Sequence, residues 1–186
     1  RTEVVRAIIG ADPRTGGKVF LNGKPLNCRT PHDAIVNGVV MVPEDRKLQG
    51  IIPRMSVGRN ISIGSLDQIT NRLGFVNTRR EEQIGLEGKA NFNIKTPDLE
   101  KPIVELSGGN QQKAIVARWM STKPEVLILD EPTKGIDVGA KSEFYNMICE
   151  FAKEGLAVIL ISSELPEVIG LSDRIIVMRG RRIVGE

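Results

Sequence analysis

Two acidic residues, Asp130 and Glu131, end the apolar run VLIL and stand directly before Pro132. Open α/β sheets bind ligands at the carboxyl ends of their strands, so an acid pair at this place suits chemistry on a bound ligand. One carboxylate could act through Mg²⁺ while its neighbour polarises a water molecule. Asp-Glu-Pro is also good turn chemistry, and the pair taken alone favours neither interpretation.

A second unusual stretch is Ser-Gly-Gly-Asn-Gln-Gln, directly ahead of the helix-period run 114–120. A helix start needs one capping residue, which Ser107 could supply. It does not need two successive glycines, each of which costs about 1 kcal/mol inside a helix. We therefore expect something to approach the backbone closely at Gly108 and Gly109.

An alternation of helices and short apolar strands is predicted to position these residues. Strands are expected at 39–43, 126–130, 157–162 and 174–180, and helices at 30–38, 138–153, 164–170 and along the glycine-led segment up to 120. Short continuous apolar strands separated by helices indicate a parallel sheet covered on both faces.

The remaining segments are less regular. The chain opens on a helical pattern that stops at Gly10, and an Asn-Gly pair within 16–26 predicts a hairpin. Helices are expected at 57–66 and 77–94, although Gly85 and Gly88 weaken the second prediction. The charged segment 44–56 is expected to be a functional loop. Its Asp45, Arg46 and Lys47 either pair locally with one another or contact a partner.

Composition limits the function classes. With 186 residues, 40% of them hydrophobic, the chain can bury one core as a single domain with a small subdomain. The net charge is +3, the basic residues are scattered, and 4% aromatics are too few for a base-stacking platform, so nucleic acid is not expected as a partner. Cys28 and Cys149 have no metal or redox spacing, which is typical of a reduced cytosolic protein. No apolar run reaches the roughly 18 residues of a membrane span.

The spacing of the motifs resembles the ATP-binding cassette (ABC) ATPases. In that family LSGGNQQK (106–113) is the signature motif, VLILDE is Walker B, and Gly135, Ile136 and Asp137 form the D-loop. The resemblance covers essentially the whole chain. It implies a P-loop NTPase-like α/β fold, with a parallel sheet flanked by helices, a small helical subdomain at about 54–122 that includes the signature motif, and an incomplete N-terminal β-subdomain.

The resemblance also gives the glycines a role. In the family, the signature helix directs its N-terminus at the γ-phosphate of an ATP held by the opposite cassette of a head-to-tail dimer, where free N–H groups and the helix dipole attract phosphate. Asn110 stands where many cassettes have Gln. The residues implied to contact the partner's ATP are Ser107, Gly108, Gly109, Asn110 and Gln111.

The chain's own nucleotide site departs from the family pattern. Arg1 aligns with the phosphate-loop lysine, which is not a conservative exchange, while Thr2 keeps the Mg²⁺-binding hydroxyl. Glu44 replaces the Q-loop glutamine and Ser163 the switch histidine. The only histidine, His32, is expected on a helix surface. The implied set is Arg1, Thr2, Glu44, Asp130 and Ser163 for nucleotide, Thr2 and Asp130 for the metal, and Glu131 as the catalytic residue.

Four segments narrow the resemblance further. LSGGNQQK, VPEDRK (42–47), DEPTKGIDVGAK (130–141) and SSELPEVIGLSDRIIVM (162–178) are similar to the second, C-terminal cassette of tandem ATPases that drive monosaccharide import, of the ribose, arabinose, xylose and galactose type. This implies ATP and Mg²⁺ as cofactors. It also implies a partner cassette (the N-terminal half or a homodimer mate), membrane permease subunits, indirectly an extracellular or periplasmic sugar-binding protein, and a peripheral place on the cytoplasmic face of the bacterial inner membrane.

Because its own site departs from the pattern, the cassette is expected to bind nucleotide weakly or hydrolyse it slowly. The alternatives are a nucleoside-import ATPase and a non-hydrolysing interaction module. A cytosolic ABC protein acting on ribosomes or DNA is less favoured, because the long coiled-coil insertions, zinc cysteines or basic linker usual in such proteins are not found in this sequence. The signature motif argues against a stand-alone hydrolase, since its helix has no use without a facing cassette. The chain opens inside a helical pattern and ends inside a predicted strand. We therefore expect 1–186 to be one nucleotide-binding domain truncated at both ends, with an N-terminal segment either present without order or supplied by a neighbouring chain.

Overall fold

The computed structural model describes residues 1–186, which divide into two compact units. Unit 1 comprises Arg1–Met41, Pro124–Pro132 and Tyr145–Glu186, and unit 2 comprises Val42–Lys123 and Thr133–Phe144. The helical subdomain predicted at about 54–122 lies within the second of these. None of the helices has the length and apolar character needed to cross a membrane.

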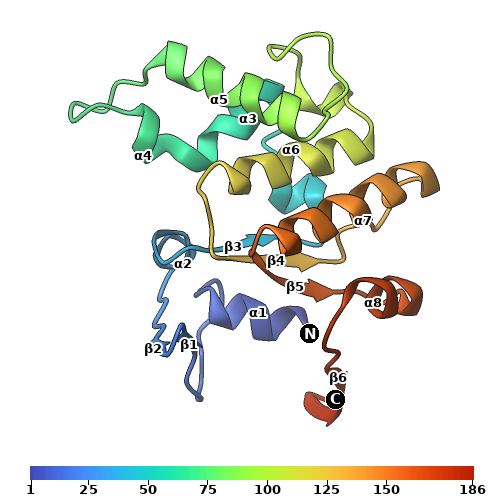
Figure 1. Ribbon diagram of the computed structural model, residues 1–186. Coiled ribbons are helices and arrows are strands. Elements are labelled where there is room, and N and C mark those ends of the chain that lie inside the picture. The colour runs from blue at the N-terminus through green and yellow to red at the C-terminus, as the bar shows by residue number, and fades with distance from the viewer. The chain divides into compact units, whose positions relative to one another are not determined.

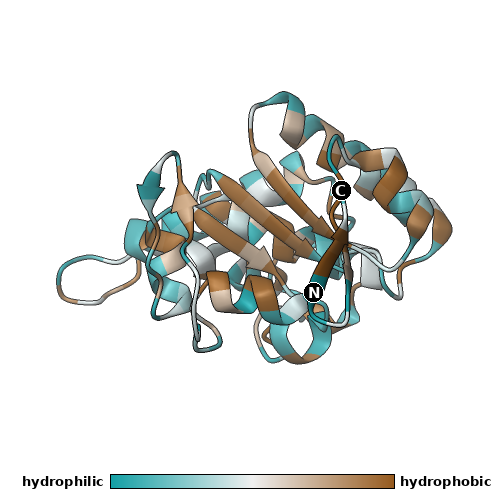
Figure 2. Ribbon diagram, turned by 90° about the horizontal axis from the view of Figure 1, so that it is seen from below, coloured by the Kyte–Doolittle hydropathy of each residue, from teal (hydrophilic) through white to brown (hydrophobic).

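Unit 1 is built on a three-stranded sheet with the order β3 (Val39–Val42), β4 (Val126–Asp130) and β5 (Ala157–Ile161) (Figure 1). β4 and β5 run parallel, in register from Val126 opposite Ala157 to Asp130 opposite Ile161. Leu127, Ile128 and Leu129 have no solvent exposure. β4 is apolar up to Asp130 because a strand buried on both faces has no polar side, and the strands of this sheet are brown in Figure 2. β5 alternates between exposed and less exposed positions, and Ile159 on it is 41% exposed.

Helix α1 (Thr2–Ile8) packs on this sheet. Val5 and Ile9 lie in one buried cluster with Ile128 and Ile161. The helix stops where the sequence predicts, at Gly10, whose φ is +75°. A Cβ there would lie 2.6 Å from the backbone nitrogen of Thr30, so only glycine fits this close approach.

The connection from α1 to the sheet also follows its sequence signals. β1 (Phe20–Leu21) and β2 (Lys24–Pro25) form an antiparallel hairpin, and Asn22 and Gly23 both have the positive φ of its two-residue turn. α2 (Pro31–Val36) begins with Thr30 as its cap and a proline at its first position. His32 is exposed on this helix, as expected.

The strand predicted at 174–180 is wrong in length and in setting. Only β6 (Val177–Arg179) forms there, and it pairs antiparallel with β7 (Arg182–Gly185). The cause is the intervening pair Gly180 and Arg181, both with positive φ, which turns the chain back on itself. β6 and β7 thus form a separate two-stranded sheet, and the main sheet consists of β3, β4 and β5 alone.

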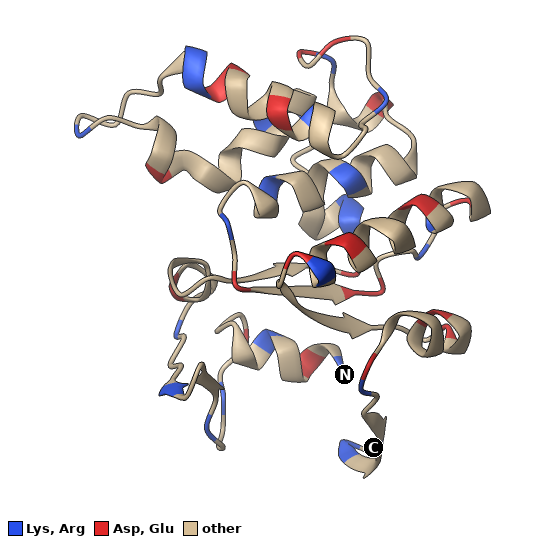
Figure 3. Cartoon of the chain, in the orientation of Figure 1, with Lys and Arg blue, Asp and Glu red and all other residues tan.

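Unit 2 contains three packed helices, α3 (Val57–Ser62), α5 (Thr78–Asn91) and α6 (Gly108–Met120), with the short α4 (Leu66–Ile69) between α3 and α5 (Figure 1). Its helices carry charges of both signs (Figure 3). The glycines that weaken the prediction of α5 have a packing role. A Cβ on Gly88 would lie 2.7 Å from Cγ2 of Ile61, and one on Gly85 would lie 3.3 Å from Cα of Gly58, so both let α5 approach α3 closely.

Two further features complete the chain. The segment predicted as a loop at 44–56 contains a π-helical turn, Arg46–Gly50, which Asp45 caps by accepting hydrogen bonds from the N–H groups of Lys47 and Leu48. α7 (Val138–Lys153) begins in unit 2 and ends in unit 1, and α8 (Leu165–Leu171) follows β5.

Candidate functional site

The acid pair lies at the carboxyl end of β4, as predicted. Asp130 is the last residue of the strand and is fully buried. Glu131 follows with a φ of +46°, which is uncommon for a residue other than glycine. Its N–H donates to the carbonyl of Ile161 (2.8 Å) and its Oε2 accepts from the hydroxyl of Ser163 (3.0 Å). Left-handed backbone of this kind is concentrated at functional sites.

Arg1 lies at the same edge of the sheet. Its guanidinium Nη1 donates to the carbonyl oxygen of Ser162, the residue before Ser163, and Thr2 begins α1. Unit 1 therefore brings a cation, two carboxylates and a hydroxyl to the carboxyl ends of β4 and β5.

The chemistry of this set fits Mg²⁺ with nucleotide. The structure has no group of three or more His, Cys, Asp or Glu side chains that could hold a metal by themselves. Mg²⁺ is commonly bound by one or two protein oxygens, with water and substrate phosphates completing its shell. Asp130 and Thr2 offer a carboxylate and a hydroxyl oxygen, which are ligands of the required kind.

The signature segment starts α6 in unit 2. Ser107 is the N-cap, as the sequence predicts, and its Oγ accepts from the backbone N–H (3.4 Å) and the side-chain Nδ2 (2.9 Å) of Asn110. Gly108 and Gly109 occupy the first two helical positions, where N–H groups have no acceptor within the helix. Free donors at the positive end of a helix favour an anion.

In this structure, atoms of the chain itself lie close to both glycines. A Cβ on Gly108 would lie 2.6 Å from Nη2 of Arg46, and one on Gly109 would lie 2.9 Å from Cβ of Ala140. A larger residue at either position would therefore displace the start of α6 from its neighbours.

The D-loop is held by residues of segment 44–56. Arg46 donates to the carbonyl oxygens of Lys134 (2.8 Å) and Gly135 (3.1 Å), and Glu44 pairs with Lys134 (2.6 Å). Gly135 has a positive φ of 66°. Since Asp45, Arg46 and Lys47 form no ion pair with one another, the local-pairing interpretation of this segment is wrong.

The remaining residues of the D-loop and of the signature motif differ in exposure and in their hydrogen-bond partners. Ile136 is buried, and Asp137 caps α7 by accepting from the N–H of Ala140 (2.9 Å). Gln111 is 6% exposed and donates to the carbonyls of Ile103 (3.3 Å) and Leu106 (3.1 Å). Its side chain therefore binds the loop that precedes α6, whereas Ser107 is exposed.

Sequence reasoning missed the link between segment 44–56 and the D-loop. The sequence predicts no role for Lys134. For Arg46 it leaves two interpretations open, a local ion pair and a contact with a partner protein. The only signals are a lysine directly before the D-loop glycine and an arginine in an otherwise turn-rich segment. Neither signal specifies a partner nearly ninety residues away along the chain.

The model of the family described as ABC transporter matches residues 1–134 of this chain. The chain belongs to the ABC transporter family. Like other ABC ATPases it has a P-loop NTPase-like α/β fold, a parallel sheet flanked by helices. Over 99% of this chain and 78% of the other, it matches a dimeric ATP-binding cassette, MJ0796, solved in a post-hydrolysis state with ADP and Pi (TM-score 0.82, 16% identity).

Curated ABC relatives are more similar in sequence. The arabinose import ATP-binding protein AraG of Mannheimia succiniciproducens is 52% identical over all of this chain and 37% of its own length. A Rhizobium etli protein named for ribose, galactose and methyl galactoside import is 50% identical over all of this chain and 35% of its own length. The chain thus spans little more than a third of these ABC proteins.

Proposed function

We propose that this chain is the second, C-terminal cassette of a tandem ABC ATPase that couples ATP binding and hydrolysis to monosaccharide import. Relatives named for arabinose, ribose and galactose import support a sugar rather than a nucleoside as the cargo. The chain would work with a partner cassette, membrane permease subunits and, indirectly, a sugar-binding protein, on the cytoplasmic face of the membrane.

The observation that carries the proposal is the donor set at the start of α6. The Oγ of Ser107 already accepts two hydrogen bonds, so its own hydrogen is left to donate. The N–H groups of Gly108 and Gly109 lie beside it, and the guanidinium of Arg46 packs against Gly108. Such an array suits the terminal phosphate of an ATP bound by a facing cassette.

In this proposal, ATP bound at the chain's own nucleotide site is hydrolysed only slowly. Arg1, in the place of the phosphate-loop lysine, donates to a backbone carbonyl of its own chain. Glu44, at the Q-loop position, is paired with Lys134. Thr2 and Asp130 would hold Mg²⁺, which when bound neutralises phosphate charge. Glu131 would retain the role of polarising water.

The proposal is tested by two substitutions in the intact protein assembled with its permease. Ser107→Arg fills the start of α6 and should abolish ATP turnover, while Glu131→Gln should lower it only modestly. Ser142→Arg and Glu154→Gln make the same chemical changes at exposed positions and serve as controls. If Glu131→Gln lowers turnover more than Ser107→Arg does, the proposal that hydrolysis occurs mainly at the ATP bound by the partner cassette is refuted.

The runner-up, a module that only completes a partner's site, differs in what the chain does alone. ATP binding and hydrolysis by the isolated chain at millimolar ATP separate the two. Slow but measurable turnover that Glu131→Gln removes supports a weak site, and complete silence supports the module.

A further inference from the structure

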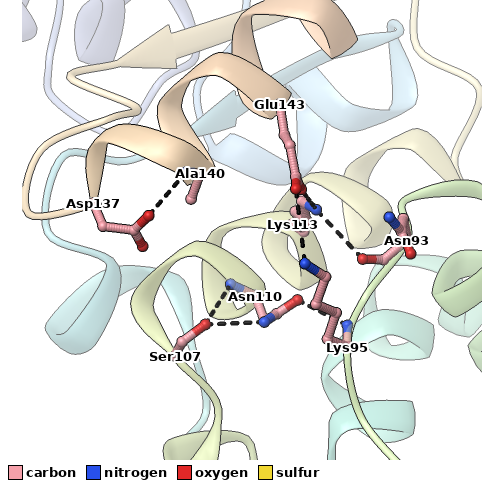
Figure 4. A network of polar contacts seen from close by, with 8 residues as sticks. All are labelled: Asn93, Lys95, Ser107, Asn110, Lys113, Asp137, Ala140 and Glu143. Carbon is pink, nitrogen blue, oxygen red and sulfur yellow. Dashed lines mark hydrogen bonds and ion pairs between the residues drawn. The ribbon is translucent and has the colours of Figure 1, made fainter.

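The side chain of Asn110 joins two parts of unit 2 (Figure 4). Its Oδ1 accepts from the backbone N–H of Lys95 (2.8 Å), and its Nδ2 donates to Oγ of Ser107 (2.9 Å). The orientation of the amide follows from this pairing. A backbone N–H can only donate, so the amide oxygen must face Lys95 and the amide nitrogen must face Ser107.

From this geometry we infer that Asn110 is a positioning residue that makes the Ser107 hydroxyl a donor toward phosphate. The inference rests on the proposed function of the signature segment. With both acceptor positions of Oγ directed at Asn110, the hydroxyl hydrogen points away from α6. A hydroxyl that accepts a hydrogen bond is also a stronger donor, because successive hydrogen bonds polarise one another.

The segment that carries the backbone N–H of Lys95, the partner of the Asn110 oxygen, is itself held by side-chain contacts. Lys113, with a side chain only 8% exposed, reaches from α6 to the carbonyl of Asn93 (3.3 Å) and to Glu143 on α7 (2.5 Å). Nζ of Lys95 lies 3.8 Å from the same carboxylate. The segment that presents the Lys95 N–H is thus tied to both helices, and the amide of Asn110 has one orientation that satisfies it (Figure 4).

The substitution Asn110→Asp isolates this role. A carboxylate keeps the shape and can still accept from Lys95, but it cannot donate to Ser107, whose hydroxyl would then turn inward to donate to it. ATP turnover of the intact protein should be compared for wild type, Asn110→Asp, Ser107→Ala and the double variant. Asn77→Asp is the matched control, because Asn77 caps α5 through an oxygen that aspartate also supplies.

We expect Asn110→Asp to lower turnover by about tenfold to a hundredfold, the effect of losing one hydrogen bond to a charged group. In the Ser107→Ala background the same change should cost less than about twofold, since there is no hydroxyl left to orient. An equal loss in both backgrounds would mean that the new charge acts by itself, and wild-type turnover would mean that Asn110 has no such role; either result overturns the inference. If Ser107→Ala alone is fully active, the proposed function fails first and the role of Asn110 fails with it.

A spectroscopic measurement covers the case in which Asn110→Asp does not fold. The side-chain amide protons of Asn110 should shift when Ser107→Ala removes their acceptor, while the backbone amide of Lys95 keeps its signal and its protection from exchange. Unchanged side-chain amide signals would contradict the hydrogen bond on which the inference depends.

Discussion

The guanidinium of Arg46 lies 3.1 Å from the carbonyl oxygen of Gly135, and the two residues are 89 positions apart in the chain. The same group donates to the carbonyl of Lys134 and fills the space over Gly108. The side chain of Arg46, from segment 44–56, therefore contacts both the D-loop and the signature motif. A side chain that binds two successive carbonyls restricts the loop that contains them.

Arg46→Lys should loosen the D-loop. A lysine ammonium is a compact charge that does not reproduce the planar fork of arginine, so one of the two carbonyl contacts is lost. We expect amide hydrogens at 134–140 to exchange several-fold faster in the variant, measured by hydrogen–deuterium exchange with mass analysis. Arg54→Lys, at an exposed position of the same unit, should leave that exchange unchanged. Equal protection in wild type and Arg46→Lys would show that the D-loop is held by other contacts.

Gly88→Ala should destabilise the protein although alanine is the better helix former. The added methyl would lie 2.7 Å from Cγ2 of Ile61, and overpacking of this kind costs about 1–3 kcal/mol. Gly170→Ala on α8 is the opposite case, because no atom lies within 4 Å of its Cβ position, and it should stabilise by up to about 1 kcal/mol. Urea unfolding of both variants checks the prediction, which fails if the two shifts have the same sign.

The ion pair of Glu143 with Lys113 should make stability depend on acid pH. The hydrogen bond and charge of Lys113, with Lys95 nearby, hold the pKa of Glu143 below its ordinary value of 4.5. A carboxyl with a lowered folded pKa contributes stability above the unfolded value, and that contribution is lost as pH falls through the folded pKa. Glu143→Gln should therefore destabilise by at most about 1 kcal/mol near neutral pH, because Lys113 loses its ionic partner while solvent screens the half-exposed carboxylate.

A comparison with the variant separates the Glu143–Lys113 pair from the other carboxyl groups that titrate in acid. The pKa values of Asp12, Asp33 and Glu186 are also lowered by their own partners, so wild type loses stability in acid for several reasons. The informative quantity is the difference in unfolding free energy between wild type and Glu143→Gln. It should be constant above pH 4.5 and shrink below it. A difference independent of pH would assign the effect to packing.

The elements with local signals could be predicted from the sequence. The Asn22–Gly23 turn, the Thr30 cap, the Gly10 stop and the apolar strand that ends at Asp130 each depend on residues within a few positions of one another. The end of the chain could not be predicted equally well. Gly180 and Arg181 interrupt an apolar pattern without a strong turn signature, so 174–180 resembled one continuous strand.

The candidate site was predictable in its residue types and less so in its contacts. The motif positions place Asp130, Glu131 and Ser163 at neighbouring strand ends, and the structure brings the last two within hydrogen-bond distance. The partners of Arg46 and Asn110 depend on how loops distant in sequence are folded against α6. Periodicity and caps carry no information on such contacts, because any polar side chain on an exposed loop satisfies the same pattern.

Arg118→Lys should weaken the packing of the signature helix against α3. Arg118 is buried, and its guanidinium donates to the carbonyl of Gly50 (2.7 Å) and to both the carbonyl (2.6 Å) and Oδ1 (2.9 Å) of Asn60. Burial lowers the pKa of Arg118 to about 10, so the side chain is still charged at neutral pH and depends on these three acceptors. A lysine reaches fewer of them, and each buried acceptor left without a donor costs about 1–3 kcal/mol. We expect a loss of about 2 kcal/mol or more in urea unfolding at neutral pH. Arg59→Lys, exposed on α3, should change stability by less than about 0.5 kcal/mol, and an equal effect of the two variants would show that the buried hydrogen bonds of Arg118 do not hold α6 in place.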